Sequence, residues 1–230
     1  MPLTKRDLMA GMAGLGAEFG MGLAAPVQAK PGRDSERMLL YSAEIGDADT
    51  VARLIGIGVD IEVRDSRRRT ALLVATHKDH VEVARILIGA GADVNAKDAI
   101  DDSPFLYAGA EGRIEILRLT LAHGADLAST NRYGGTALIP ACHHGHVEAV
   151  YMLLKTKIDI NHVNRLGWTA LLEAVILGDG GPTYIEIVDA LVHAGADTRI
   201  ADREGVTPLV HARKRGFAQI AALLENEPKR

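Results

Sequence analysis

Residues Thr70–Asp98 read TALLVATHKDHVEVARILIGAGADVNAKD, and the same design returns along the rest of the chain. The stretch opens with a threonine, continues through two short segments with apolar residues at helical spacing, and closes on Gly91-Ala92-Asp93-Val94-Asn95. The opening Thr or Ser recurs at intervals of 33, 33, 33 and 38 residues, at Thr70, Ser103, Thr136, Thr169 and Thr207. The closing aspartate recurs at the same four intervals, at Asp60, Asp93, Asp126, Asp159 and Asp197. Two residue types that recur at the same intervals of about 33 residues indicate an array of structural repeats.

Each unit contains signals for two helices and a hairpin. The Thr or Ser is placed to cap the first helix through its hydroxyl, and Pro104 and Pro208 follow at the first helical position. A residue able to adopt the left-handed conformation ends that helix: Gly46, Asp79, Gly112, Gly145, Gly178 or Gly216. A second helix follows, for example at 147–154 or 185–192, and Asp or Asn at 65, 98, 131, 164 and 202 then opens a hairpin. The ladder of closing aspartates is interpreted as structural because it stands in the turn of every unit.

Aligning the units defines the predicted domains. The repeat domain spans 36–227, with units 36–64, 65–97, 98–130, 131–163, 164–201 and 202–224. The first unit lacks the opening Thr and the last lacks the closing Gly-Ala-Asp, as expected of polar terminal caps. Residues 30–35 are a predicted linker and 228–230 a tail. The fifth unit is five residues longer, around Gly180–Tyr184, which predicts a longer surface turn with Tyr184 as a second contact residue.

Residues 1–29 have the order of a secretory signal. Lys5-Arg6 gives a positive start, a Gly/Ala/Met-rich segment follows, and Val27-Gln28-Ala29 resembles a cleavage site. The segment 4–9 also resembles the twin-arginine export motif, although Lys5 replaces its first Arg and Glu18 interrupts the apolar part. We therefore expect export to the periplasm by the twin-arginine or the general route; a tail retained on a cytosolic protein is the alternative.

Composition excludes several classes of function. Of the 230 residues 47 % are hydrophobic and 4 % aromatic, and the net charge of −4 gives no reason to expect nucleic-acid binding. A single cysteine, Cys142, excludes a disulfide framework. No apolar run is suited to span a membrane. The chain contains no phosphate loop, dinucleotide fingerprint or catalytic constellation, so we expect no cofactor and no enzymatic activity.

The repeated residues resemble those of the ankyrin-repeat family. Its marks Thr-Pro-Leu-His, Gly-His-x-Glu and Gly-Ala-Asp-Val-Asn have counterparts at 207–209, 145–148 and 91–95. The resemblance covers about 36–227 and implies an all-α solenoid of about six helix-turn-helix units with projecting hairpin loops. Arg68 and Asp101 stand where hairpin tips usually have glycine, which predicts two distorted tips, and Pro140 is expected to fray the start of its helix. His80 and His146, in the Gly-His position, are expected to be hydrogen-bonded structural residues.

The resemblance also implies protein binding through the hairpin tips and the exposed face of the first helices. In this chain those positions include Arg67, Arg69, His77, Lys78, Ile100, Asp102, Arg132, Tyr133, His143, His144, Arg165, Leu166, Trp168, Arg203 and Glu204. Three arginines, at 132, 165 and 203, share one tip position and predict a spaced basic row. Tyr133, Leu166 and Trp168 would be apolar anchors beside it. The alternative is that Trp168 packs over its own hairpin and the arginines are solvated.

The sequence CHHGH at 142–146 suggests a competing function, an enzyme or a metal-dependent sensor. A zinc site needs three or four converging ligands, whereas neighbours on a helix diverge by about 100°, so we expect no metal site and a buried Cys142. The preferred hypothesis is a monomeric, non-enzymatic, periplasmic protein that binds one protein partner. It could protect or organise an envelope enzyme or neutralise a secreted toxin as an immunity protein. If residues 1–29 are retained, a cytosolic regulator or an effector is the alternative.

Overall fold

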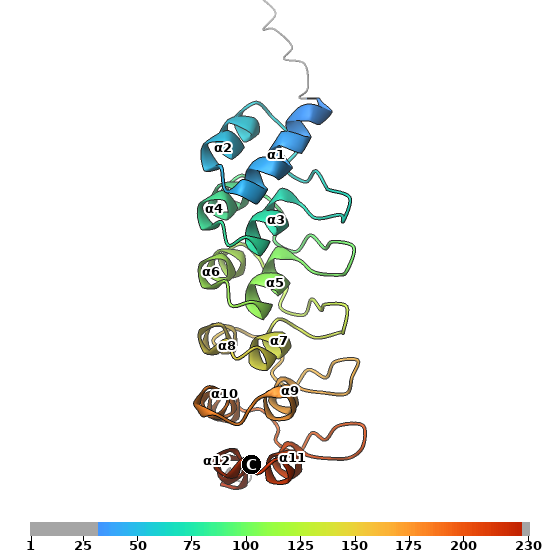
Figure 1. Cartoon of the computed structure of the whole chain (residues 1–230), viewed down its shortest axis with the longest axis vertical. Coiled ribbons are helices and arrows are strands. Elements are labelled where there is room, and N and C mark those ends of the chain that lie inside the picture. The colour runs from blue at the N-terminus through green and yellow to red at the C-terminus, as the bar shows by residue number, and fades with distance from the viewer. Residues whose placement is uncertain (1–31, 227–230) are drawn as a thin grey trace, which may run out of the picture. The chain divides into compact units, whose positions relative to one another are not determined.

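The computed structural model describes residues 32–226, which form twelve α-helices and no β-strand (Figure 1). Helices α1–α6 are α1 (Arg33–Ile45), α2 (Ala48–Gly56), α3 (Ala71–His77), α4 (Val81–Gly89), α5 (Pro104–Ala110) and α6 (Ile114–Ala122). Helices α7–α12 are α7 (Leu138–His143), α8 (Val147–Leu154), α9 (Ala170–Leu177), α10 (Pro182–His193), α11 (Pro208–Lys214) and α12 (Ala218–Glu225). The predicted all-α repeat fold is confirmed.

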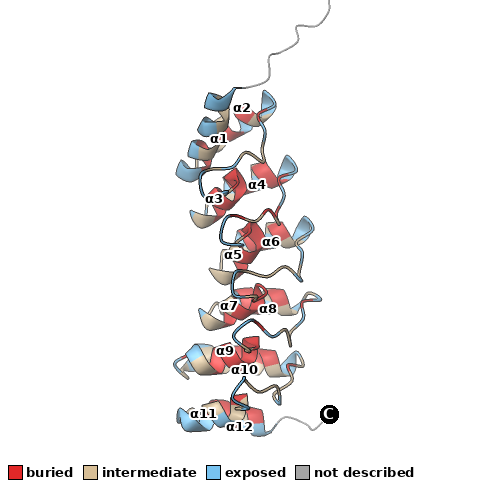
Figure 2. Cartoon of the chain, turned by 90° about the vertical axis from the view of Figure 1, so that its right-hand side faces the viewer, coloured by how far each residue is buried: buried red, intermediate tan, exposed pale blue. Residues whose placement is uncertain are grey.

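The helices form two parallel layers, each built by contacts between successive units. The first helices stack as α1, α3, α5, α7, α9 and α11, and the second helices stack as α2, α4, α6, α8, α10 and α12. Hairpin loops project from one side of every helix pair (Figure 1). Buried residues concentrate along the middle of the helix stack, as Figure 2 shows, and make one continuous apolar core from Leu39 to Leu224. Each unit therefore buries its apolar face against its neighbours.

Four of the five predicted hydroxyl caps are present. The side-chain oxygens of Thr70, Ser103, Thr169 and Thr207 accept hydrogen bonds from the backbone N–H three residues ahead. The prediction is wrong at Thr136, whose Oγ1 is buried and has no partner within the described residues. There the N–H of Ile139 donates to the backbone oxygen of Thr136 at 3.2 Å, and Pro140 has no N–H to offer. Helix α7 consequently begins only at Leu138.

The turns after the first helices use the left-handed conformation as predicted, with one exception. Gly46, Gly112, Gly145, Gly216 and also Asp79 have φ between 58° and 79°. Gly178 is extended instead, at φ −66°, and Gly180 takes the left-handed position within the longer fifth unit. The prediction for Gly178 was therefore wrong, because the insertion moves the turn by two residues.

The two hairpin tips without glycine are not distorted. Arg68 has φ 62° and Asp101 has φ 64°, close to Gly134 at 73° and Gly205 at 74° in other tips. The hairpin is held at its first residue, where the Asp65 carboxylate accepts the N–H groups of residues 67 and 69. Asp98, Asn131, Asn164 and Asp202 repeat this pair of bonds. The same pair of bonds thus holds the hairpins with and without glycine in one conformation.

The insertion in unit five is structural rather than a free surface turn. Pro182–Tyr184 form the first turn of α10, which therefore begins before the predicted position 185. The Tyr184 hydroxyl donates to the backbone oxygen of His143 at 2.7 Å, and its ring packs against the core. Tyr184 is therefore half-buried and holds the insertion to unit four, and its role as a second contact residue stays a prediction.

At the termini, the predicted signal segment 1–29 and the tail 228–230 lie outside the described residues. Helix α1 begins at Arg33, so residues 33–35 of the predicted linker are helical. None of the helices in residues 32–226 is long and apolar enough to cross a bilayer.

Candidate binding groove

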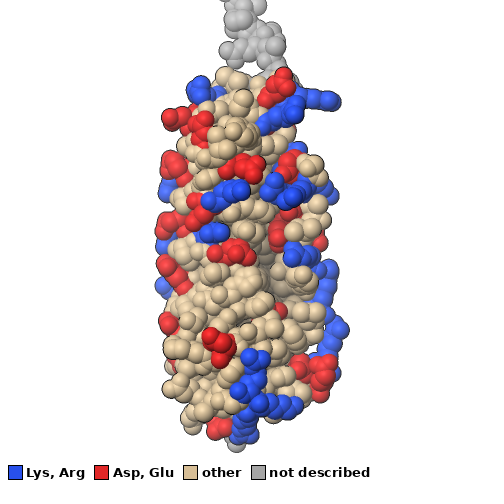
Figure 3. Space-filling model, viewed as in Figure 1, with Lys and Arg blue, Asp and Glu red and all other residues tan. Residues whose placement is uncertain are grey.

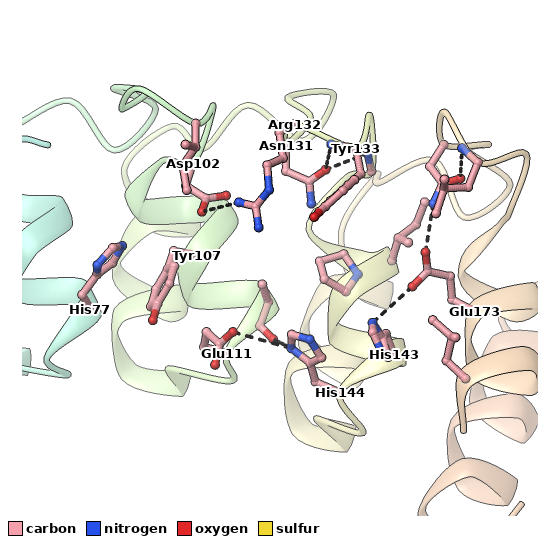
Figure 4. A pocket seen from close by; sticks show the side chains of 18 residues that line it. His77, Asp102, Tyr107, Glu111, Asn131, Arg132, Tyr133, His143, His144 and Glu173 are labelled. Atoms are coloured by element: carbon pink, nitrogen blue, oxygen red, sulfur yellow. Dashed lines mark hydrogen bonds and ion pairs between the residues drawn. The ribbon is translucent and has the colours of Figure 1, made fainter. Parts of the chain in front are cut away.

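Side chains from units two to five line a groove of about 580 Å³ between the hairpins and the first helices (Figure 4). The lining residues are His77, Ile100, Asp102, Tyr107, Ala110, Glu111, Asn131, Arg132, Tyr133, Gly135, Ile139, Pro140, His143, His144, Asn164, Leu166, Glu173 and Leu177. Ile100, Tyr133, Leu166 and Leu177 are between 41 % and 51 % exposed, and they gather in this one groove instead of being scattered singly. The groove thus offers apolar contact area next to charged groups.

A buried carboxyl group lies at the end of the groove nearest unit five. Glu173, on α9, is only 6 % exposed and accepts a hydrogen bond from Asn164 Nδ2 at 2.9 Å. Its Oε2 lies 3.6 Å from Nδ1 of His143, on α7 (Figure 4). Burial raises the pKa of Glu173 to about 7 and lowers the pKa of His143. Burial therefore shifts both groups toward their uncharged forms and weakens the ion pair.

An arginine forms the hairpin side of the groove. Arg132 Nη1 lies 3.7 Å from Asp102 Oδ2, and its guanidinium carbon lies 4.8 Å from the centre of the Tyr133 ring. Burial, followed by the neighbouring charge of Asp98, raises the pKa of Asp102. The arginine is therefore held by groups on both sides while its end remains exposed. At the opposite end of the groove the rings of His77 and Tyr107 stack with centres 4.0 Å apart.

The predicted row of Arg132, Arg165 and Arg203 is present. Within it, each of the last two arginines is hydrogen-bonded to the hairpin of the preceding unit. The Arg165 guanidinium donates to the backbone oxygen of Arg132 at 2.9 Å, and that of Arg203 donates to the backbone oxygen of Arg165. Their stems pack against Gly134 and Gly167, where an added Cβ would lie within 2.8 Å of the arginine Cγ. Basic side chains gather along the hairpin side in Figure 3. The row thus stabilises the hairpin stack while keeping exposed charge.

The predicted contact residues divide between the groove and other positions. Those that line the groove are His77, Ile100, Asp102, Arg132, Tyr133, His143, His144 and Leu166. Those outside it are Arg67, Arg69, Lys78, Arg165, Trp168, Arg203 and Glu204. Of the second set, Arg69 is paired with Asp65 at 2.7 Å and Lys78 lies 3.7 Å from Glu44. Trp168 is half-buried, and its backbone N–H donates to Asn164.

Sequence reasoning missed Glu173, Tyr107 and Asn164 as groove residues. Glu173 lies four residues after Thr169, the position that Tyr107 occupies after Ser103. A signal for Glu173 was available, because it is the one charged residue in the apolar helix ALLEAVIL. An acidic side chain at a buried helical position needs a polar partner. Here that partner is Asn164, which also opens the hairpin.

Cys142 does not belong to the groove. It is fully buried, and this burial raises its thiol pKa well above the ordinary value. A thiol in that environment is a packing residue rather than a reactive group.

Comparisons with known proteins agree with this architecture. Family models described as ankyrin repeats (3 copies) match residues 22–98, 39–131 and 105–202. The Escherichia coli K12 ankyrin repeat protein YahD is 48 % identical over 52 residues, which is 23 % of this chain and only 26 % of YahD. Among solved structures, an ankyrin repeat domain from Acinetobacter baumannii (ABAYE2397) is 54 % identical with a TM-score of 0.81, covering 83 % of this chain and 97 % of that one.

Two further structures are similar. The ankyrin repeat protein EF0377 is 40 % identical with a TM-score of 0.81, and again 83 % of this chain and 97 % of that one are covered. The ankyrin repeat domain of Bcl-3, of the IkappaB family, is 26 % identical with a TM-score of 0.75 over 84 % and 86 % of the two chains. Ankyrin repeats are in general non-enzymatic modules for protein interaction. The chain belongs to the ankyrin-repeat family.

Proposed function

We propose that this protein binds one protein partner as a monomer, and that a segment of the partner lies in the groove between the hairpins and the first helices. The supporting observation is the set of exposed apolar side chains in the groove, contributed by units three to five. Water leaves such surfaces favourably when a partner covers them. No catalytic step is part of the proposal.

The groove has separate elements for affinity and orientation. Tyr133 and Leu166 are about half exposed in the groove and would bury large apolar side chains on binding. Arg132 is held in place by Asp102 and Tyr133, so little side-chain freedom would be lost when it contacts an acidic group of the partner. Arg165 and Arg203 would extend the positive potential along the hairpins and accelerate association.

We further propose that the partner is an envelope protein, reached after export and removal of residues 1–29. The order of basic, weakly apolar and small residues in this segment supports export. The N-terminal mass of the native protein tests it, because export predicts a chain that starts at Lys30. An intact Met1 in the cytoplasmic fraction would contradict it and leave the groove proposal unaffected.

Site-specific photo-crosslinking in cells tests the groove. A photoreactive residue at Leu166 is expected to capture a discrete protein, whereas the same residue at Tyr151, exposed on α8 away from the groove, is not. The captured protein should bind the purified chain one to one. The double variant Tyr133→Ala, Leu166→Ala should weaken this affinity at least about tenfold, since such anchors dominate interface energies. Equal crosslinking from both positions, or unchanged affinity of the double variant, would contradict the proposal.

A further inference from the structure

Glu111, His144 and His146 form a cluster where units three and four meet. One ligand atom from each side chain can be chosen so that all lie within 4.8 Å of one another. Glu111 follows helix α5, His144 follows α7 and His146 precedes α8, so three turn positions bring them together. The histidines of one unit do not converge by themselves, and His143 faces Glu173 instead. The third member of the cluster, Glu111, comes from the neighbouring unit.

The repeat array provides an internal comparison for these histidines. In unit two, His80 Nε2 is hydrogen-bonded to the backbone oxygen of Glu44 at 3.0 Å. The equivalent oxygen two periods later belongs to Ala110, and His144 Nδ1 binds it at 2.7 Å in place of His146. The predicted structural hydrogen bond is thus confirmed for His80 and wrong for His146. Within the described residues neither ring nitrogen of His146 has a hydrogen bond.

The hydrogen bond of His144 prepares that residue for ligation. A bond to a carbonyl oxygen keeps the proton on Nδ1 and leaves a lone pair on Nε2. Metal-binding histidines usually have such a partner, which fixes the tautomer and the orientation of the ring.

The distances are compatible with an ion after small side-chain movements. Bonds of about 2.0 Å in a tetrahedral zinc site place ligand atoms roughly 3.3 Å apart. One ligand atom from each of the three side chains already lies within 4.8 Å of the others, and the Glu111 side chain is 38 % exposed and can move closer. Imidazole and carboxylate together favour zinc-class ions over Mg²⁺ or Ca²⁺, which prefer oxygen ligands alone.

We propose that Glu111, His144 and His146 bind one divalent transition-metal ion of the zinc class, with a fourth position open to water. The ion would connect unit three to unit four, because Glu111 belongs to unit three and both His144 and His146 belong to unit four. It would therefore stabilise the middle of the array. Glu111 and His144 also line the groove, so a bound ion would lie at its edge, whereas ion binding itself does not require a partner.

Calorimetric titration of Zn²⁺ into the untagged full-length chain tests the proposal. One ion per chain is expected to bind, and Glu111→Gln and His146→Gln should each weaken its binding at least about tenfold. His143→Gln, next to the cluster, and His80→Gln, at the structural histidine of unit two, are matched controls and should change the affinity less than about threefold. Zn²⁺ should also raise the thermal midpoint of the wild-type protein but not that of Glu111→Gln.

Several results would overturn the proposal. They are the absence of saturable binding to the wild-type chain, unchanged binding in Glu111→Gln, or a loss caused by His143→Gln and not by Glu111→Gln. His146 packs against Gly112, so its replacement could affect folding. Glu111 is partly exposed, so the Glu111→Gln protein is expected to fold, which circular dichroism verifies. Its zinc affinity therefore decides the proposal.

Discussion

Nδ1 of His143 lies 3.6 Å from Oε2 of Glu173, across the boundary between units four and five. The carboxyl group is nearly inaccessible to water, and Asn164 Nδ2 donates a hydrogen bond to it. Helices α7 and α9 therefore meet at a polar pair inside an otherwise apolar contact. The pair makes this boundary sensitive to pH.

Replacing Glu173 with Gln is expected to remove a pH-dependent loss of stability. The pKa of Glu173 rises from 4.5 to about 7, so between these values the folded chain holds a proton that the unfolded chain has released. Stability consequently falls as the pH rises through this window. The loss between pH 5 and pH 8 amounts to at most about 2.5 kcal/mol. Urea unfolding of both proteins at the two pH values measures it.

The amide of the Gln variant can still accept the hydrogen bond from Asn164, so the packing of α9 is retained. The difference between the two proteins cancels the titration of the groups that lie far from Glu173, so it reports on Glu173 and its neighbour His143. Identical pH dependence of the two proteins would contradict the buried, protonated state of Glu173.

Thr136 and Thr169 should respond in opposite ways to valine. Thr169 Oγ1 accepts a hydrogen bond from Leu172 N at 3.2 Å, and Thr169→Val is expected to cost about 1 kcal/mol. The Thr136 hydroxyl is buried with no partner within the described residues, so Thr136→Val should be neutral or stabilising by up to about 1 kcal/mol. Denaturation midpoints of the two variants test this pair. Equal losses would show that Thr136 also acts as a cap.

Tyr184→Phe should destabilise the array although the insertion lies at its surface. The hydroxyl donates to the backbone oxygen of His143, and its removal leaves that oxygen short of one bond, at a cost of about 1 kcal/mol. Tyr41, 57 % exposed on α1, provides the control, and Tyr41→Phe should have no measurable effect. A Tyr184→Phe protein as stable as the control would restore the interpretation of the insertion as a free loop.

Glycine at the two unusual hairpin tips is expected to stabilise the protein. Arg68 and Asp101 adopt left-handed φ values that cost a non-glycine residue about 1–2 kcal/mol. The greater freedom of glycine in the unfolded chain offsets part of this, which leaves a gain of about 0.5–1 kcal/mol for each change.

The reverse change provides the control for these tips. Gly134→Ala should destabilise, because its Cβ would lie 2.8 Å from Cγ of Arg165 in a left-handed turn. Thermal unfolding compares the three variants, and a loss of stability in Arg68→Gly would show that its side chain contributes more than its backbone costs.

The register predicted Arg132, Tyr133 and His143 as groove residues because family contact positions recur at fixed places in each unit. It missed Glu173, which lies one helical turn before the contact position at Leu177. Aligning the units shows only the features that they share, whereas a buried glutamate at this position occurs in unit five alone. Its position in the groove depends on how α9 packs against α7.

The sequence alone determined the repeat fold, the division into units and most of the helix ends. These features follow from local chemistry repeated every 33 residues: a capping hydroxyl, a left-handed turn residue and an Asp or Asn that binds the next backbone N–H groups. Only the tertiary structure decided which side chains of neighbouring units meet. The Glu173–His143 pair and the cluster of Glu111, His144 and His146 depend on the stacking of one unit on the next. The spacing along the chain shows which positions of two units are equivalent. Whether side chains touch across the boundary between two units depends on the interhelical distance and on side-chain direction, which the packed core determines.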